Sequence, residues 1–374
     1  MAKKDWMVKT TELDDQQREV FFSVLDKSCI VTGCAGSGKS VLALLKAQRI
    51  QKEKGQDSCQ VIVYTKSLSG FMRKGKESLN LSSKFYYYEE WKWKKTMRRY
   101  GRLGMLPVYE RDGNGDKIPN MPSTDYVIVD EIQDFEQSEI QEFISATGKN
   151  FFFFGDEAQS IFQKYRNTIS PSAINKIFFP AGGGAKLWEL YYNHRLPIPV
   201  AQVAQYVGVN LPPFNPKIYK SEETELPRFI CYQSKDEQIE AVSRIIKNQD
   251  LEDVAILLPT GDDVKSVYDA LCNLGIDCEV KYDDRGNIRN SLDTLDFDTP
   301  NAKIMTYHSA KGLQFETVFL PYIELYYDDR ADDSRALYVA MTRTSRNLFL
   351  MYCGQLPSPI NGIDSSMYKT TEIG

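Results

Sequence analysis

Short apolar runs of three to five residues alternate along this chain with longer segments whose apolar residues recur at helical spacing. Helical periodicity is clear at Asp236–Lys247 and Asp262–Leu274, and it also fits Ser334–Met341. Continuous apolar strands separated by helices are typical of parallel sheets covered on both faces, so the pattern predicts an α/β fold. The expected strands are Cys29–Thr32, Val61–Tyr64, Tyr126–Val129, Phe151–Phe154, Val254–Leu258, Ile304–Thr306, Thr317–Leu320 and Leu348–Tyr352.

Length and one proline-containing stretch divide this pattern into two parts. The chain has 374 residues, which suggests about two domains rather than one core. The stretch Arg195–Pro199 separates the two sets of apolar runs. We therefore expect one domain at residues 1–195 and a second at residues 196–374. Within the first, a long interval rich in Gly, Asn and Asp turn residues predicts a small insertion at about residues 72–124.

The segment GCAGSGKS, Gly33–Ser40, carries the clearest chemistry in the chain. It fits the pattern G-x-x-x-x-G-K-[ST], follows an expected strand and precedes a helical pattern, which is the context of a phosphate-binding loop. Backbone N–H groups at a helix N-terminus favour an anion. In such a loop Lys39 reaches the β- and γ-phosphates and Ser40 binds Mg²⁺. The sequence therefore predicts that this chain binds a nucleoside triphosphate.

A second apolar strand ends in two acids, Asp130 and Glu131. Beside a phosphate loop, Asp130 can hold the Mg²⁺ shell while Glu131 polarises the attacking water, the positioning that phosphoryl transfer needs. Taken alone, an acidic pair after a strand is more often a turn or a helix cap. The pairing with Gly33–Ser40 favours the catalytic interpretation. After the next strand, Gln159 offers a donor and an acceptor to a γ-phosphate or its water.

Composition indicates the class of protein but no particular chemical activity. A hydrophobic content of 42% and a charged content of 26% describe an ordinary globular protein, and no apolar run approaches the roughly 20 residues that span a bilayer. The N-terminal sequence MAKKDWMVKT leads into polar residues rather than an apolar leader. The seven cysteines are odd in number and contain no C-x-x-C pair, which favours free thiols over a zinc or iron–sulfur site. We expect a cytoplasmic protein.

Positive charge is concentrated in one region of an acidic chain. The formal net charge is −5, yet residues 66–102 hold eleven Lys and Arg against three Glu. Within this region, residues 85–100 interleave aromatic rings with cations. Single-strand grooves use that mixture, because bases stack on rings while Lys and Arg neutralise phosphates. A half-buried face with lysines reaching to solvent explains it equally well, so both interpretations stay open.

Several motifs follow one another along the chain in a fixed order. They are Leu13–Gln17, Gly33–Ser40, Tyr64–Lys66, VDEIQD at residues 129–134, GDEAQSIF at residues 155–162, Asn193–Arg195, Met305–Phe315 and Leu337–Arg343. With these motifs the chain resembles the superfamily 1 helicases of the UvrD/Rep-like group, in a compact form and over most of its length. That resemblance implies two RecA-like lobes with an ATP cleft between them.

The resemblance assigns roles to individual positions. Gln17 would read the adenine edge, Gln159 would couple the γ-phosphate to the nucleic-acid channel, and Arg195 and Arg343 would be arginine fingers. The expected catalytic residues are Lys39, Glu131, Gln159, Arg195 and Arg343. The expected nucleotide-binding residues are Gln17, Gly33, Ala35, Gly36, Ser37, Gly38, Lys39, Ser40, His194, Arg195, Gly312, Gln314 and Arg343. Ser40 and Asp130 are the expected metal ligands, and Thr65, Lys66, Tyr165 and His308 the expected nucleic-acid contacts.

Several positions depart from the family pattern. His194 stands where an adenine-stacking tyrosine is usual, and Gln314 replaces a glutamate near the ribose. Base stacking after Phe162 falls to Tyr165 or is lost, because the usual Gly-Trp-Arg run is absent. In longer relatives a large subdomain is inserted before the His308 motif. Here residues 281–302 form a short Asp- and Asn-rich segment that allows a loop and no domain.

These features together predict an ATP-dependent single-stranded nucleic-acid translocase or helicase, with ATP and Mg²⁺ in the interlobe cleft. DNA is favoured over RNA as the track, and the family resemblance favours 3′-to-5′ movement. The trimmed architecture keeps an alternative open: an ATP-driven switch or motor subunit that gates a protein partner, such as a nuclease in a repair or antiviral defence complex, and unwinds weakly itself.

Overall fold

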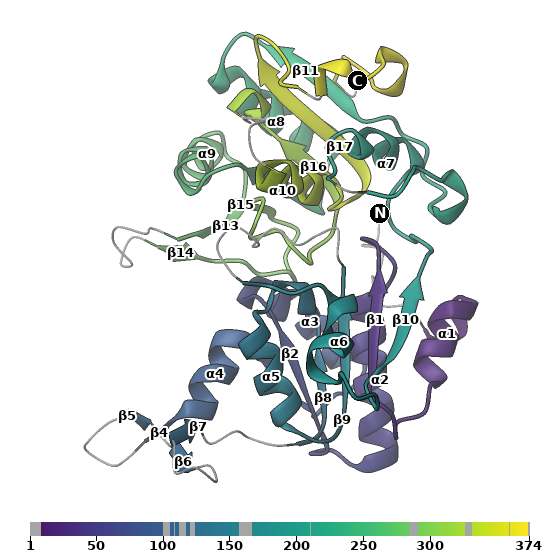
Figure 1. Ribbon diagram of the computed structural model, residues 1–374. Coiled ribbons are helices and arrows are strands. Elements are labelled where there is room, and N and C mark those ends of the chain that lie inside the picture. The colour runs from purple at the N-terminus through teal and green to yellow at the C-terminus, as the bar shows by residue number, and fades with distance from the viewer. Residues whose placement is uncertain are drawn as a thin grey trace.

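The computed structural model describes residues 9–99, 105–107, 109–111, 117–119, 124–156, 167–209, 211–283, 291–325, 331–358 and 360–372. Two α/β lobes lie one above the other, with the C-terminal lobe at the top of the view (Figure 1). The N-terminal lobe is built on a six-stranded sheet and the C-terminal lobe on a seven-stranded sheet. The expected α/β class, with two lobes built on mostly parallel sheets, is confirmed.

The sheet of the N-terminal lobe has the order β10-β1-β9-β8-β2-β3, and all its neighbours run parallel. Its strands alternate their apolar side chains between two cores: on β1, Cys29 and Val31 face one core and Ile30 faces the other. Both faces are thus buried, which is why these strands read as continuous apolar runs. The bounds are β1 Cys29–Gly33, β2 Cys59–Val63, β3 Lys84–Tyr87, β8 Thr124–Val129, β9 Thr147–Gly155 and β10 Lys186–Leu190.

The C-terminal sheet has the order β11-β17-β16-β12-β15-β13-β14. Its strands are parallel except β14, which pairs antiparallel with β13 at the edge. On the central strand, Ala255 and Leu257 face one core while Ile256 faces the other. The bounds are β11 Arg228–Tyr232, β12 Val254–Leu258, β13 Cys278–Tyr282, β14 Leu292–Asp293, β15 Ala302–Thr306, β16 Phe315–Leu320 and β17 Thr344–Cys353.

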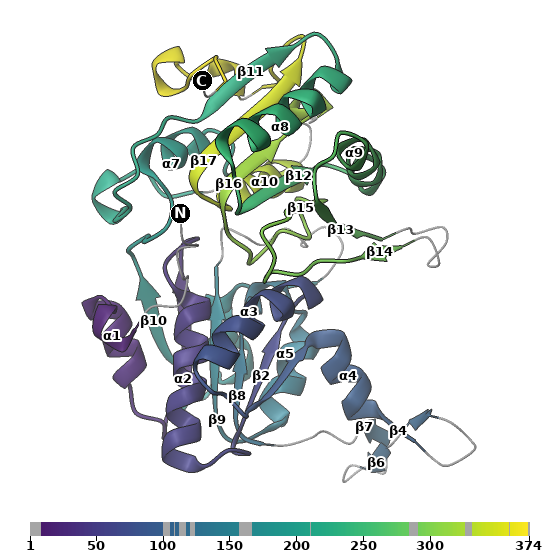
Figure 2. The same ribbon diagram turned by 180° about the vertical axis from the view of Figure 1, so that it is seen from behind.

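Helices cover both faces of each sheet (Figures 1 and 2). In the N-terminal lobe they are α1 Asp15–Phe22, α2 Lys39–Lys54, α3 Lys66–Ser78, α4 Tyr88–Thr96, α5 Gln137–Ser145 and α6 Ile174–Phe178. In the C-terminal lobe they are α7 Ile198–Gln205, α8 Lys235–Gln249, α9 Gly261–Asn273 and α10 Ala331–Met341. Leu196, just past the expected boundary at residue 195, is already buried in a core of the C-terminal lobe.

The expected insertion at residues 72–124 begins too early, because much of that interval belongs to the main fold. Residues 72–78 complete α3, and β3 adds a parallel edge strand beside β2. Beyond α4, two small antiparallel pairs follow, β4 Met97–Arg99 with β5 Met105–Pro107, and β6 Tyr109–Arg111 with β7 Lys117–Pro119. They extend away from the lobe at its lower edge (Figure 1). The turn-rich sequence indicated an insertion, but β3, with the sequence KFYY, is exposed or half-exposed along its length and was not predicted as a strand.

Candidate ATP site between the lobes

Neighbouring strands of the N-terminal sheet bring the phosphate loop and the acidic pair to one edge. β9 lies between β1 and β8, so the carboxyl ends of all three strands face the same side. The loop after β1 runs into α2, whose N-cap Gly38 has a left-handed backbone with φ 85°. A side chain there would be strained, and a Cβ would lie 2.6 Å from Nε2 of Gln17. The glycine therefore permits the tight entry to the helix that aims its N–H groups at an anion.

Lys39 and Ser40 occupy the first turn of α2 and face the strand ends. The Lys39 ammonium donates to the carbonyl oxygens of Gly33 and Cys34 at 2.8 Å each, and lies 3.8 Å from Asp156. The Ser40 hydroxyl donates to Oδ2 of Asp130 over 2.5 Å. A hydroxyl and a carboxylate at this separation are the hard oxygen donors that Mg²⁺ prefers, so the donor set fits that ion. The predicted metal ligands are thus brought together.

The acidic pair is buried, and its two members differ in environment. Burial and the adjacent Glu131 charge raise the pKa of Asp130 to about 7, against the Ser40 hydrogen bond and Lys39. Burial also acts to raise the pKa of Glu131, but the Lys311, Lys39 and Arg343 charges outweigh it and hold that pKa below its usual value. Glu131 therefore stays an ionised carboxylate, the form that can accept a proton from water.

Glu131 is held in an unusual backbone conformation. Its φ of 58° and ψ of 41° place it in the left-handed region, which costs a non-glycine residue of order 1–3 kcal/mol. Its carboxylate accepts a short hydrogen bond from the side-chain amide of Gln133. The carbonyl of the same amide accepts from the backbone N–H of Asp156 at 2.9 Å. Gln133, which the sequence argument did not single out, thus joins the acidic pair to the end of β9.

The segment that joins the lobes is tied to the phosphate loop. The Asn193 amide donates to the carbonyl oxygen of Ala35 over 2.5 Å, and its Oδ1 accepts from the backbone N–H groups of Arg195 and Leu196. The backbone N–H of His194 donates to the carbonyl of Gly36 over 2.9 Å. The interlobe segment is therefore hydrogen-bonded directly to the phosphate loop. Asn193 was quoted in a motif but not among the expected site residues.

Gln17 and His194 meet beside the loop through Asp14. Gln17 Nε2 donates to the carbonyl of Ser37 at 3.0 Å, and its Oε1 accepts from the backbone N–H of Asp14. The His194 ring nitrogen Nε2 lies 2.7 Å from Oδ2 of Asp14. Both ends of the Gln17 amide are bonded within the protein, so recognition of a base by Gln17 requires it to exchange one of these bonds. Among the described residues, the buried hydroxyl of Ser37 has no hydrogen-bond partner, which suits a loop that receives phosphate oxygens.

The two candidate arginine fingers, the half-buried Arg195 and the buried Arg343, lie next to each other where the lobes meet. Nη2 of Arg195 donates to the carbonyl oxygen of Thr342 over 2.8 Å, at the residue before Arg343. Arg343 donates to the carbonyl of Val339 and, from Nη1, to the carbonyl of Leu313. Burial, reinforced by the Arg343 charge, lowers the pKa of Arg195 to about 9, which leaves the guanidinium charged at neutral pH. Burial likewise lowers the pKa of Arg343.

A buried ion pair crosses from one lobe to the other. The Lys311 ammonium lies 2.5 Å from Oδ1 of Asp134 and 4.0 Å from Oε2 of Glu131. The side chains of Lys311 and Asp134 are 2% and 0% exposed. Both residues belong to motifs that the sequence identifies, yet neither was expected at the site. Only the packing of the lobes places a cation of one motif against the acids of the other.

Gly312 lets the C-terminal lobe approach α3 closely. Its φ is 78°, and a Cβ added there would lie 2.9 Å from Cδ1 of Leu68. Gln314, expected near the ribose, follows Leu313, whose carbonyl accepts from Arg343. Gly312 of the C-terminal lobe therefore lies at a close contact with the N-terminal lobe, and the role of Gln314 stays a prediction.

Thr65, Lys66 and His308, the expected nucleic-acid contacts among the described residues, lie near the junction of the lobes. Thr65 caps α3 by accepting from the backbone N–H of Leu68, and Lys66 forms an ion pair with Asp293 of the C-terminal lobe at 2.7 Å. The His308 carbonyl accepts from the N–H of Lys311. Gln159 and Tyr165 fall outside the described residues.

Two aromatic residues of the segment at residues 85–100 are packed inside the N-terminal lobe. Tyr88 and Trp91 are 2% and 0% exposed and belong to a core of the N-terminal lobe. The Trp91 indole N–H donates to Oε1 of Gln60 over 3.0 Å. These two rings are therefore core side chains and not a stacking surface for bases. Side chains from residue 93 to residue 123 lie outside the description.

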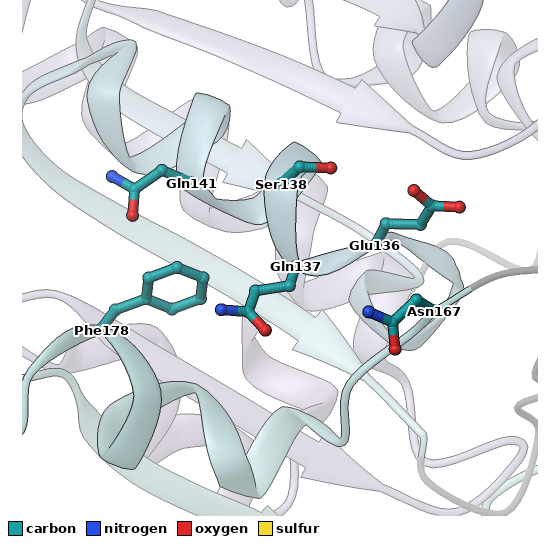
Figure 3. Close-up of a pocket in the computed structure, with 6 residues that line it drawn as sticks. All are labelled: Glu136, Gln137, Ser138, Gln141, Asn167 and Phe178. Carbon is teal, nitrogen blue, oxygen red and sulfur yellow. The ribbon is translucent and has the colours of Figure 1, made fainter.

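Other features of the described residues add little chemistry. All seven cysteines are free thiols, and the described part of the chain holds no cluster of three metal-binding side chains. No described helix has the length and apolar character that a membrane span requires. Figure 3 shows a hollow at the start of α5, lined by Glu136, Gln137, Ser138, Gln141, Asn167 and Phe178. None of the expected site residues lines it.

Comparison with known proteins places the motifs in two family models. A model described as an AAA domain matches residues 16–164, and one described as a UvrD-like helicase C-terminal domain matches residues 301–351. The ATP-dependent DNA helicase Rep of Buchnera aphidicola is 42% identical over 60 residues, which is 14% of this chain. A putative ATP-dependent DNA helicase of Acanthamoeba polyphaga mimivirus is 26% identical over 282 residues, which is 65% of this chain. The chain covers 9% and 37% of these two relatives.

Solved structures are more distant. The C-terminal domain of a possible DNA helicase from Lactobacillus plantarum is 17% identical, with a TM-score of 0.35; the match covers 47% of this chain and 98% of that domain. The arterivirus nonstructural protein 10 helicase is 14% identical, with a TM-score of 0.43, over 93% of this chain and 63% of that one. The two family matches and the sequence relatives make this chain similar to the superfamily 1 helicases, with an AAA-type domain in the N-terminal lobe and a UvrD-like helicase C-terminal domain in the C-terminal lobe.

Proposed function

We propose that this chain is an ATP-driven translocase on single-stranded nucleic acid, with DNA as its track and movement in the 3′-to-5′ direction. The observation that supports it best is the composition of the interlobe region. Lys39 and the acidic pair lie on one lobe, and the buried Arg343 lies on the other. The positive charge of Arg343 helps to lower the pKa of Glu131 across the interface. A site divided between two lobes can couple hydrolysis to their relative movement.

Each side chain has a defined part in the proposed hydrolysis. Lys39 binds the β- and γ-phosphates after exchanging its two loop carbonyls for phosphate oxygens. Ser40 and Asp130 would hold Mg²⁺, which would neutralise charge on the phosphates. Glu131 accepts a proton from the attacking water. Arg195 and Arg343 stabilise charge that develops on the transferred phosphoryl group, a task that suits a planar, permanently charged guanidinium.

The coupling to movement follows from the interlobe connections. ATP draws the two arginines and the phosphate loop together, and the loop is bonded through Asn193 to the segment that joins the lobes. Closing and reopening the cleft then alternately shifts the lobes along a strand that lies across both of them. Thr65 and Lys66 at the start of α3 and His308 on the opposite lobe supply contacts on each side.

Steady-state ATP hydrolysis tests this proposal directly. The rate is measured without nucleic acid, with single-stranded DNA, with RNA and with duplex DNA, and Glu131→Gln serves as the blank because it keeps shape but cannot accept the proton. We expect stimulation of about ten-fold or more by single-stranded DNA, abolished in the variant. Movement of the chain toward a 5′-end block, and not a 3′-end block, measures polarity. A rate unchanged by every single strand would exclude an autonomous translocase.

A second candidate is favoured by the short segment between β13 and β15. Residues 283–301 contribute only β14, a two-residue strand, among their described part. A motor without a domain at this place can serve as an ATP-driven switch that gates a protein partner such as a nuclease. The ATPase series distinguishes the two, because a partner-gated switch stays slow with single strands alone and accelerates only when the partner is added.

A further inference from the structure

A short acidic segment of the C-terminal lobe lies along helix α3 of the N-terminal lobe. We call residues 292–298, with the sequence LDTLDFD, the strap. Asp293 at one end forms an ion pair with Lys66 at 2.7 Å, and Asp298 at the other end lies 3.7 Å from Lys74. Both views show the extended chain beyond β14 running across the top of α3 (Figures 1 and 2).

An aromatic contact lies between the two ion pairs. The rings of Phe71 on α3 and Phe297 on the strap meet edge to face with centroids 5.7 Å apart. Gly70 lies beside the same ring, since a Cβ added there would be in ordinary contact with Phe297 at 3.6 Å. Leu295 and Phe297 also pack against a core of the C-terminal lobe. The strap is thus seated on α3 by two carboxylates and one ring.

The two lysines that contact the strap lie on one side of α3. Lys66, Gly70 and Lys74 follow one another at intervals of four residues and form one stripe along the helix. Eight residues of helix rise about 12 Å, a distance that five extended residues of the strap can span. Phe71, beside these lysines, is partly buried. Cations beside an accessible ring face are the elements with which proteins hold single strands, because phosphates pair with lysines and bases contact rings. On the strap, carboxylates take the place of phosphates and Phe297 takes the place of a base.

We propose that the strap is an intramolecular mimic of the nucleic-acid strand, which covers this stretch of the track until a strand displaces it. The inference rests on the proposed function, because it takes Lys66 as a nucleic-acid contact. Its consequence is autoinhibition of binding: a strand must compete with Asp293 and Asp298 for the same lysines. β14 holds one end of the strap to β13 through the Lys281–Asp293 and Tyr282–Leu292 pairings, so the mimic stays tethered after it is displaced.

The two ion pairs between the strap and α3 are exposed to solvent, as is expected if a nucleic-acid strand can displace the strap. Lys66 is 63% exposed and Asp298 is 62% exposed, so both ion pairs are open to water and salt. Exposed pairs contribute little individually, and a polyanion that neutralises several cations competes with them effectively. The buried Lys311–Asp134 pair, by contrast, is not open to such competition. The strap can therefore leave without opening the ATP site.

A fixed spacer between the lobes is the competing explanation, and hydrogen exchange separates the two on the unmodified protein. Exchange is followed in peptides covering the strap and α3, with and without a 16-nucleotide oligothymidylate and without ATP. A displaced mimic predicts faster exchange in the strap and slower exchange in α3 when the oligonucleotide binds. If the oligonucleotide binds and exchange in the strap is unchanged or slower, the strap is a spacer and the proposal is overturned.

Binding affinity supplies an independent readout. Asp293→Asn combined with Asp298→Asn removes two negative charges from the strap, and Glu240→Gln combined with Glu252→Gln removes two from exposed positions elsewhere on the same lobe. By fluorescence anisotropy, we expect the strap variant to bind the oligonucleotide about five-fold more tightly than the native chain, because less of the population is covered. The control should stay within about two-fold. Equal affinity of the strap variant and the control would overturn the mimic.

Two further outcomes separate this proposal from the proposed function. If Lys66→Gln in the strap-variant background leaves oligonucleotide binding unchanged, the track does not pass over α3, and the strap proposal fails while an ATP-driven translocase stands. If neither the native chain nor the strap variant binds the oligonucleotide with or without ATP, the proposed function fails and the strap proposal fails with it.

Discussion

Replacement of Lys311 by methionine removes the cation of the buried ion pair that joins the two lobes. Lys311 is 2% exposed, Asp134 is 0% exposed, and their charged atoms are 2.5 Å apart. Methionine keeps much of the side-chain volume but leaves the carboxylates of Asp134 and Glu131 in one buried site without this cation. Removing one partner of a buried pair costs about 3–5 kcal/mol of unfolding free energy.

The lobes themselves set an upper limit on that cost. If the lobes separate, water hydrates the Asp134 carboxylate and its unpaired charge is no longer buried. The destabilisation caused by Lys311→Met therefore cannot exceed the free energy of opening the interface plus the attraction lost with the ion pair. Asp134→Asn alone should be similarly costly, and the double variant should cost less than the sum, with a coupling of at least about 2 kcal/mol. The exposed Lys74–Asp298 pair is the matched control across the same interface, and Lys74→Met should cost less than about 1 kcal/mol.

Urea unfolding followed by two probes measures this series. All four tryptophans lie at residues 6, 91, 93 and 188, so tryptophan fluorescence reports the N-terminal lobe while far-ultraviolet circular dichroism reports both lobes. We expect Lys311→Met to lower the midpoint and to separate the two transitions, because it removes a buried ion pair that joins the two lobes. A loss for Lys311→Met no larger than that for Lys74→Met would refute the reasoning and indicate that water enters the interface in solution.

Three other perturbations test the site. Gly312→Ala should slow ATP hydrolysis at least ten-fold, because the added Cβ forces Leu68 away. Gly354→Ala is the control: its φ of 74° is similar but the space around it is open, so it should lower only the stability, by about 1 kcal/mol. Equal effects of the two variants on hydrolysis would contradict the close interlobe approach. The pKa of Asp130 near 7 predicts that Mg²⁺ affinity, measured calorimetrically with a non-hydrolysable ATP analogue, falls as pH drops from 8 to 6, because protonation removes the ligand; a flat profile would contradict it. Burial raises the pKa of Cys34 to about 11, so N-ethylmaleimide at pH 7 should label the exposed cysteines first, as mass spectrometry of digests would show; early labelling of Cys34 would count against its burial.

Local sequence predicted the most apolar strands well, but it missed β13 inside the C-terminal sheet and the edge strands β3, β10 and β11. β1, β8, β12 and β16 are buried on both faces and therefore read as apolar runs. β10, with the sequence KLWEL, and β3, with KFYY, lie at the edges of the N-terminal sheet, where one side of each strand has no neighbour. Polar and half-exposed residues are tolerated there, so the apolar signal is weak and both strands were missed.

The sequence by itself determined the two-part α/β organisation, the phosphate loop and the acidic strand end, because each follows from a local pattern: continuous apolar runs, a glycine-rich turn before a helix, and acids at a strand terminus. The tertiary structure alone decided which distant groups meet. Lys311 faces Asp134 across 177 positions of sequence, and Asp293 faces Lys66 across 227. No local pattern encodes such contacts, since they arise only when two separately folded lobes pack against each other and bring loops of both to one interface.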